Sequence, residues 1–145
     1  MPTLLTLTEA HPVRSLEPGE VLISKGDPGG DIFVLQSGRL SVERDGVRIA
    51  TISSEGSLVG EMSVLLGTEN TATVRAETAA TVRVIADALH YLERQPLAAL
   101  RVAMLLSQRL DATSALLVEL GQSGGNAGPG DVNRLLGTLN SGTRH

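Results

Sequence analysis

Short apolar segments separated by turn residues constrain the fold of this chain more than any other sequence feature. Turn signals rich in Gly, Pro, Asp and Ser recur at close intervals between residues 17 and 56. They are Glu17-Pro18-Gly19, residues 26–30, Ser37-Gly38, Asp45-Gly46 and Ser54-Glu55-Gly56. The Asp-Gly pair between residues 40–42 and 47–49 is typical of a two-residue hairpin. Spacing of this kind predicts antiparallel β-structure in a sandwich or barrel.

Residues 58–76 combine a turn, a short apolar helix and a polar strand. Gly60 permits a backbone conformation that is closed to other residues, and residues 61–65 predict a helix whose free amide N–H groups favour an anion. Gly67 ends that helix. The alternation of Thr with Ala and Val over residues 71–74 predicts a strand with two hydroxyls on one face. The stretch therefore predicts an anion pocket backed by an apolar core.

Composition limits the classes of protein to consider. A chain of 145 residues with 41% hydrophobic content suits one compact domain with loose ends. With one Tyr and one Phe, the core must consist of Leu, Val, Ile and Ala, and no base-stacking platform is visible. The net charge of −4 argues against a general binder of nucleic acids or acidic membranes. The absence of Cys excludes disulfides and thiolate metal sites.

Neither a membrane segment nor a catalytic centre is predicted. No apolar run reaches transmembrane length and residues 1–10 do not resemble a secretion signal, so we expect a cytoplasmic protein. His11, His90 and His145 are isolated, and no Ser lies in a nucleophile-elbow context. We therefore expect neither catalytic nor metal-ligating residues, and no enzyme activity.

The stretch that starts at Gly60 resembles the phosphate-binding cassette of cyclic-nucleotide-binding domains of the catabolite activator and protein kinase A regulatory type. The resemblance implies that Glu61 receives the ribose 2′-hydroxyl and that backbone N–H groups at the helix start hold the cyclic phosphate. The ligand-binding residues that it implies are Gly60, Glu61, Met62, Ser63, Asn70, Thr71 and Ala72. As an alternative, Glu61 is only a carboxylate favoured by the helix dipole.

Asn70 stands where the family has an Arg that neutralises the phosphate. A charge-assisted hydrogen bond contributes about 1.5–3 kcal/mol, or roughly ten- to a hundredfold in affinity, so its loss weakens binding without ending it. The Asn70 amide can still donate, and backbone donors do not depend on the side chain. Arg75 could reach back toward this place, although on a strand we expect it to face solvent.

Residues 18–27 and 32–38 look like the opening strands and glycine turns of the same family. The fold class that we predict is α+β and mostly β: an antiparallel β-roll or jelly-roll with flanking helices and a C-terminal amphipathic helix. Residues 1–12 form an N-terminal segment, either frayed or with a short helix that enters at Thr8. Residues 13–120 form the domain, and residues 121–145 form a Gly-rich flexible tail. A short helix is predicted at residues 131–139 of that tail.

Residues 97–120 carry a heptad pattern of apolar side chains. Its members are Ala103, Leu106, Leu110, Leu117 and Leu120, with Thr113 at the remaining position, and a second stripe holds Leu105, Ala112 and Leu116. The pattern predicts packing on the β-roll, a homodimer, or both. The segment resembles the dimerisation helix of catabolite-activator-type proteins, which implies that Thr113 and Ser114 contact the adenine amino group across the dimer and that Arg109 approaches Glu61. The plainer alternatives are a polar register position and surface side chains.

The sequence thus favours a small sensor of a cyclic mononucleotide, cAMP more than cGMP, that signals through helix rearrangement and an unidentified protein partner. The alternative is a degenerate nucleotide-binding fold that acts as a ligand-independent dimeric interaction module. A third reading is a regulatory piece of a larger assembly. We expect no direct DNA binding, because the residues after the long helix are too few for a helix-turn-helix module.

Overall fold

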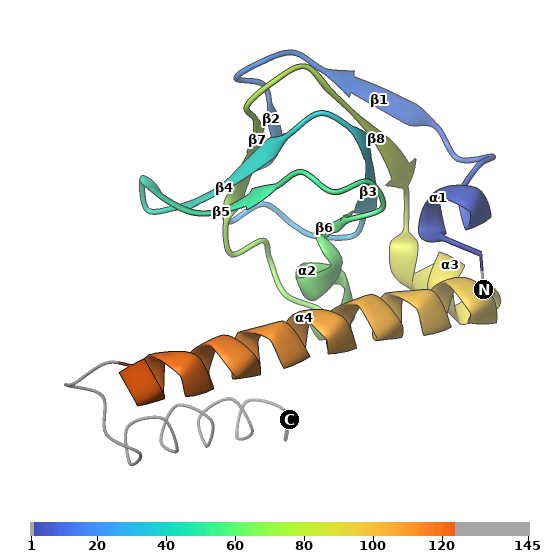
Figure 1. Ribbon diagram of the computed structural model, residues 1–145. Coiled ribbons are helices and arrows are strands. Elements are labelled where there is room, and N and C mark those ends of the chain that lie inside the picture. The colour runs from blue at the N-terminus through green and yellow to red at the C-terminus, as the bar shows by residue number, and fades with distance from the viewer. Residues whose placement is uncertain (1, 124–145) are drawn as a thin grey trace. The chain divides into compact units, whose positions relative to one another are not determined.

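The computed structural model describes residues 2–123 of the chain (Figure 1). The chain divides into two compact units, Met1–Val102 and Ala103–His145. The helix predicted at residues 131–139 and most of the Gly-rich tail lie outside the described residues.

Two four-stranded sheets form the first unit. The strands are β1 (Val13–Leu16), β2 (Val21–Ile23), β3 (Ile32–Ser37), β4 (Leu40–Arg44), β5 (Val47–Ile52), β6 (Leu58–Val59), β7 (Thr73–Ala76) and β8 (Ala80–Ile85). One sheet has the order β1-β8-β3-β6 and the other β2-β7-β4-β5, with antiparallel pairing throughout. The predicted antiparallel β-roll is confirmed, and the turn signals fall between its strands.

The β4–β5 hairpin confirms the most local of these predictions. Asp45 and Gly46 both have positive φ, 53° and 79°. Two consecutive left-handed residues are the signature of a type I′ turn, whose twist matches that of the flanking strands. The Asp-Gly pair therefore sets the two residue pairs next to the turn, and a register shift follows between Val42 and Glu43.

Aliphatic side chains fill the space between the sheets, as the composition predicted. The buried cluster comprises Leu16, Leu22, Ile23, Phe33, Leu35, Leu40, Val59, Val74, Ala76, Ala80 and Val82. Val42, Ile52 and Val84 pack against it from partly exposed positions. Burial of one such side chain stabilises the fold by roughly 1.5–3 kcal/mol. This core holds the two sheets together.

Two short helices lie at one end of the roll (Figure 1). In α1 (Leu4–Leu7), Thr3 caps the N-terminus, and Thr8 closes the helix as its Oγ1 donates to the Leu4 carbonyl. The sequence predicted a short helix that begins at Thr8, whereas α1 ends there, because Thr3 caps a helix that begins earlier. In α3 (Ala88–Arg94), the Tyr91 ring packs edge-on against His11.

Helix α4 (Pro96–Ser123) begins in the first unit, where Ala98 and Val102 are buried, and its later turns belong to the second unit. The helix confirms the prediction for residues 97–120 but continues past them, so the predicted start of flexible chain at Gly121 is wrong by three residues. Gly costs about 1 kcal/mol in a helix, which propagation at the end of a long helix offsets. No helix within residues 2–123 has the length and apolar character needed to cross a membrane.

Candidate functional site

The predicted cassette helix is α2 (Glu61–Leu66), and a left-handed glycine stands at each of its ends. Gly60 has φ 87° and precedes the helix, whereas Gly67 has φ 68° and ends it. A Cβ atom at position 60 would lie 2.9 Å from the Asp31 carbonyl oxygen, so both backbone angle and space require glycine there. The first-turn N–H groups of α2 have no partner within the helix and can donate elsewhere.

Glu61 and Met62 have opposite environments at the start of α2. The Glu61 side chain is only 3% exposed, whereas Met62 is 58% exposed. Burial of a carboxylate is costly unless hydrogen bonds or opposite charges hold it. Glu61 is therefore not a solvated first-turn charge, whereas Met62 is largely exposed to solvent.

Ser63 and Asn70 are joined by a hydrogen bond inside the cassette. The buried Ser63 hydroxyl lies 2.9 Å from Asn70 Oδ1, to which it donates, and 3.1 Å from the Gly60 carbonyl oxygen. A Cβ atom at Gly29 would overlap this hydroxyl. Asn70 is thus tied to α2 through its side-chain oxygen, which leaves its Nδ2 group to donate.

The backbone of Asn70 also pairs with the turn between β2 and β3. Its N–H donates to the Asp27 carbonyl at 2.9 Å, and its carbonyl accepts from Gly26 N–H at 2.7 Å. Regular strand pairing begins only at Thr73, and Thr73 Oγ1 accepts a hydrogen bond from Lys25 N–H. Thr71 precedes the strand and is exposed to solvent. The prediction that the two Thr hydroxyls share a strand face is therefore wrong, because the Asn70 backbone pairs with a turn before β7 begins.

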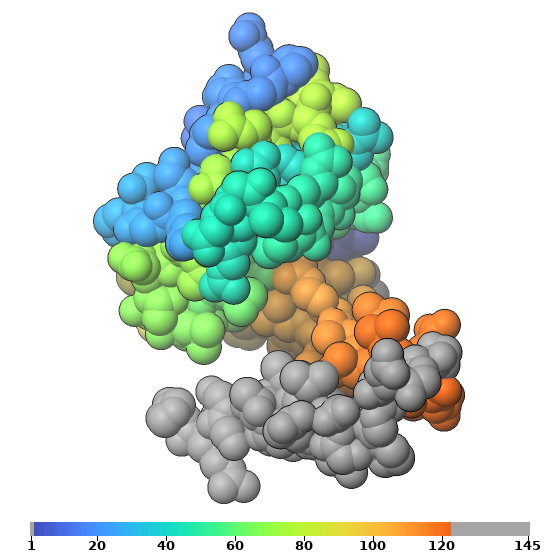
Figure 2. Space-filling view, turned by 90° about the vertical axis from the view of Figure 1, so that its left-hand side faces the viewer, coloured from blue at the N-terminus to red at the C-terminus, as the bar shows by residue number. Residues whose placement is uncertain are grey.

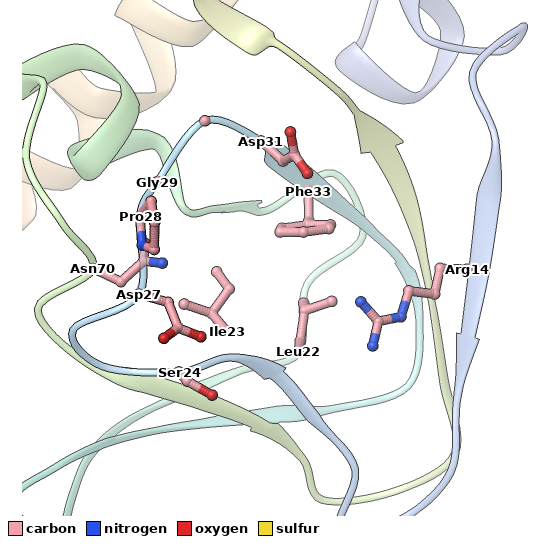
Figure 3. Close-up of a pocket in the computed structure, with 11 residues that line it drawn as sticks. Arg14, Leu22, Ile23, Ser24, Asp27, Pro28, Gly29, Asp31, Phe33 and Asn70 are labelled. Atoms are coloured by element: carbon pink, nitrogen blue, oxygen red, sulfur yellow. The ribbon is translucent and has the colours of Figure 1, made fainter.

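A cavity of about 240 Å³ lies beside Asn70 (Figure 3). Its lining includes apolar Leu22, Ile23 and Phe33 together with Ser24, Asp27, Asp31 and Arg14. Small-molecule sites usually have roughly 300–1,000 Å³. The two carboxylates oppose an anion, and Arg14 already pairs with Glu20 at 3.3 Å. This cavity is consequently a poor place for a phosphate.

A second cavity, of about 490 Å³, lies on another side of the same turn. Gly29 and Gly30 line both cavities, and the second one also includes Ser63, Thr68 and Leu89. Within residues 2–123, no group of three or more His, Cys, Asp or Glu side chains is placed to hold a metal ion.

Arg75 does not take the place of the missing cassette cation. Its Nη1 group donates to the Gly19 carbonyl at 2.9 Å, and its Nε lies 3.7 Å from a Glu43 carboxylate oxygen. A different basic residue contacts the cassette. Arg44, at the end of β4, donates from Nε to the Thr71 carbonyl at 3.2 Å. The sequence analysis missed Arg44, although its alternation with Leu40 was visible.

The other predicted site residues divide between the two units. The structure brings the residues from Gly60 to Ala72 together in the first unit, whereas Arg109, Thr113 and Ser114 lie on α4 in the second. Within α4, Thr113 Oγ1 donates to the Arg109 carbonyl at 2.9 Å, which satisfies the hydroxyl locally. Their roles toward a ligand remain predictions.

The family model described as "Cyclic nucleotide-binding domain" matches residues 13–89, just over half of the chain. Glutaminase 1 of Bradyrhizobium diazoefficiens is 36% identical over 110 residues, which cover 71% of this chain and 18% of that protein. The cAMP-dependent protein kinase type II regulatory subunit of Drosophila melanogaster is 37% identical over 65 residues, 45% of this chain and 17% of the relative.

A solved structure shows the same fold. The Thermus thermophilus catabolite activator protein aligns with a TM-score of 0.63 at 22% identity, over 94% of this chain and 81% of that one. The chain spans less than a quarter of the curated relatives named above. The matched family consists of regulatory binding modules and not of catalytic domains. With its β-roll, its cassette helix and the family match over residues 13–89, this chain belongs to the cyclic nucleotide-binding domain family.

Proposed function

We propose that the chain binds cAMP in preference to cGMP and that the bound nucleotide changes the arrangement of its C-terminal helices. The observation that carries the proposal is the buried Glu61 directly after the left-handed Gly60, inside the residues that match the family. The preference for cAMP rests on Thr113 and Ser114, because the relatives of this chain include kinases named for each of the two nucleotides.

Each end of the nucleotide has a candidate partner. The Glu61 carboxylate can accept a hydrogen bond from the ribose 2′-hydroxyl, since an ionised carboxylate is an acceptor only. The N–H groups at the start of α2 can donate to the cyclic phosphate. Thr113 and Ser114 are the proposed partners of the adenine amino group, which guanine lacks at that position.

Calorimetric titration with cAMP and cGMP tests binding. We expect a Kd for cAMP well below millimolar and weaker binding of cGMP. Glu61→Gln should weaken cAMP binding by about tenfold, because the amide is a weaker acceptor than the carboxylate. Glu55→Gln, in the exposed turn before β6, is the matched control. Absence of heat with both nucleotides at high protein concentration would reject the proposal.

Signalling requires that the nucleotide contact the roll and α4 differently in two states, because a ligand shifts an equilibrium only by its differential affinity. We propose that α4 is this two-state element, that it also forms a homodimer, and that a cytoplasmic protein partner reads its position. Spin labels at Ser15 and Gln108 should show a change in their distance distribution when cAMP is added. An unchanged distribution at saturation would exclude this output.

A second candidate is a ligand-independent dimeric interaction module. Two observations favour it: the cassette has the neutral Asn70 in the place of its cation, and Leu110, Leu116 and Leu120 are more than half exposed. A dimer that loses its stability in Leu110→Glu, together with no response to any cyclic nucleotide, would support this module. Nucleotide binding would exclude it.

A further inference from the structure

A cyclic nucleotide carries one negative charge on its phosphodiester, and the cassette has no cation of its own to match it. Asn70 is neutral and bonded to Ser63, and Arg75 is paired with Glu43. The carboxylates of the cassette and of the adjoining turn, which include Glu61, Glu69 and Asp27, carry the wrong sign. A binding site for this anion therefore needs a cation from another element.

Arg44 lies on the face of β4 that is turned toward the interior of the roll. Side chains alternate between the two faces of a strand, so Leu40, Val42 and Arg44 share one face. Leu40 is fully buried and Val42 packs against the core. Arg44 is the next residue of this series and is itself exposed, which places it where the apolar interior meets solvent.

Sheet register brings Arg44 next to the cassette. Strand β4 pairs with β7 so that Val42 faces Val74 and Glu43 faces Thr73. One further step along this register leads from Arg44 to Ala72. The hydrogen bond from Arg44 Nε to the Thr71 carbonyl confirms the proximity. In Figure 2 the β4–β5 hairpin and the cassette lie side by side on the same face of the molecule.

The guanidinium of Arg44 retains donors for a ligand. A guanidinium has five N–H groups, and one of those of Arg44 is used on Thr71. Within residues 2–123, Arg44 has no carboxylate oxygen within 4.0 Å. Of the other strand arginines, Arg14, Arg39, Arg48 and Arg75 form ion pairs, whereas Arg83 donates to the carbonyls of Glu9 and His11. Arg44 thus forms no close ion pair in the described part of the chain and lies beside the backbone of the cassette, while its charge acts on the neighbouring Asp45 at longer range.

We propose that Arg44 supplies from β4 the positive charge that the cassette lacks, and that its free guanidinium N–H groups bind the phosphodiester. The assignment rests on the proposed function and adds to it a residue 26 positions from Asn70. The Thr71 carbonyl orients the side chain through Nε, so Nη1 and Nη2 can form the paired contacts that guanidinium groups make with phosphate oxygens.

Calorimetric titration of cAMP into the full chain and its variants tests the assignment. Arg44→Gln should weaken cAMP binding by about tenfold or more. The Kd of Arg44→Lys should lie between those of the parent chain and Arg44→Gln. The matched control is Arg48→Gln, which removes the same charge from the same hairpin but from a residue paired with Glu77 at 2.7 Å. It should change the Kd by less than about twofold.

The double variant Arg44→Gln/Asn70→Arg gives a second measure. If one cation suffices, Asn70→Arg should improve binding more in the Arg44→Gln background than in the parent chain, and should restore most of the lost affinity. The Arg44 Nε–Hε resonance should also shift when cAMP is added, while that of Arg48 stays in place. Thermal melting of each variant verifies that it is folded.

The outcomes separate this assignment from the proposed function. If the parent chain binds cAMP and Arg44→Gln binds it equally well, the function stands and the assignment to Arg44 is wrong. Equal losses in Arg44→Gln and Arg48→Gln would also overturn it, because they would indicate a general charge effect. If the parent chain binds no cyclic nucleotide, both proposals fail together.

Discussion

The cassette and the β4–β5 hairpin are neighbours in the roll, yet they are built in opposite ways. In the cassette, Glu61 and Ser63 are buried, and the Ser63 hydroxyl ties α2 to Asn70. Every residue of β5 is exposed or half-buried, and Val47 and Ile49 are each more than half exposed. Two ion pairs connect the hairpin to its surroundings: Lys25 with the exposed Asp45, and the exposed Arg48 with Glu77, whose side chain is only 14% exposed.

This difference in burial between the cassette and the hairpin indicates which kind of group each region can contribute to a binding site. Buried hydrogen bonds hold the cassette donors in one geometry, which suits a fixed phosphate cradle. Exposed ion pairs contribute little to stability and leave long side chains free to move. The cassette can therefore provide a shaped set of backbone donors, while the hairpin can provide a charge.

Gly60→Ala should have the largest effect. A left-handed alanine costs about 1–2 kcal/mol, and its Cβ would also press on the Asp31 carbonyl, so we expect a total loss of about 2–4 kcal/mol in unfolding free energy. Gly46→Ala in the hairpin has the same backbone cost but open space around it, and should lose about 1–2 kcal/mol. Urea denaturation measures both. Equal losses would contradict the contrast between a packed cassette and an open hairpin.

Asn70→Arg should tighten cAMP binding by about 1–2 kcal/mol, because it adds a charge-assisted hydrogen bond to the phosphate. The gain is smaller than a full charge contact because Arg cannot keep the bond that Asn70 accepts from Ser63. Asn70→Gln, which retains an amide and adds no charge, should give no gain. Calorimetry measures each Kd, and if Asn70→Arg leaves the affinity unchanged in the Arg44→Gln background as well, the phosphate binds elsewhere.

Ser63→Ala should lower the unfolding free energy by about 1 kcal/mol, because it removes a buried hydroxyl that donates within the cassette. The exposed Ser53, after the hairpin, is the control, and Ser53→Ala should stay within about 0.5 kcal/mol of the parent. Urea denaturation of the two variants decides the comparison. A loss in Ser53→Ala as large as that in Ser63→Ala would remove the distinction between the regions.

The smallest effect concerns pH and the tip of the hairpin. The hydrogen bond from Lys25, and then its charge, hold the pKa of Asp45 below its ordinary value of 3.8. A depressed pKa stabilises the fold above the ordinary value, and this stabilisation is lost as the pH falls through the folded pKa. Lys25→Met should raise the Asp45 pKa toward 3.8 with little change in stability, because Asp45 is fully exposed. A carbon-detected NMR titration measures this, and an unchanged pKa would reject the ion pair in solution.

Sequence reasoning was most accurate where neighbouring residues decide the structure. The Asp45-Gly46 turn, the α2 helix after Gly60 and the long helix from residue 97 all follow from local chemistry or periodicity. It was wrong at element ends. Thr71 precedes β7, and α4 continues through Gly121, because long-range pairing and helix propagation decide where an element ends.

The sequence alone therefore determined the antiparallel roll, the cassette helix and the neutral residue in the place of the cation. Only the tertiary structure revealed that Ser63 holds Asn70 and that Arg44 lies against Thr71. The physical reason is that sheet register joins β4 to β7 and so places Arg44 against Thr71, 27 residues further along the chain, and no periodicity within either segment encodes that pairing.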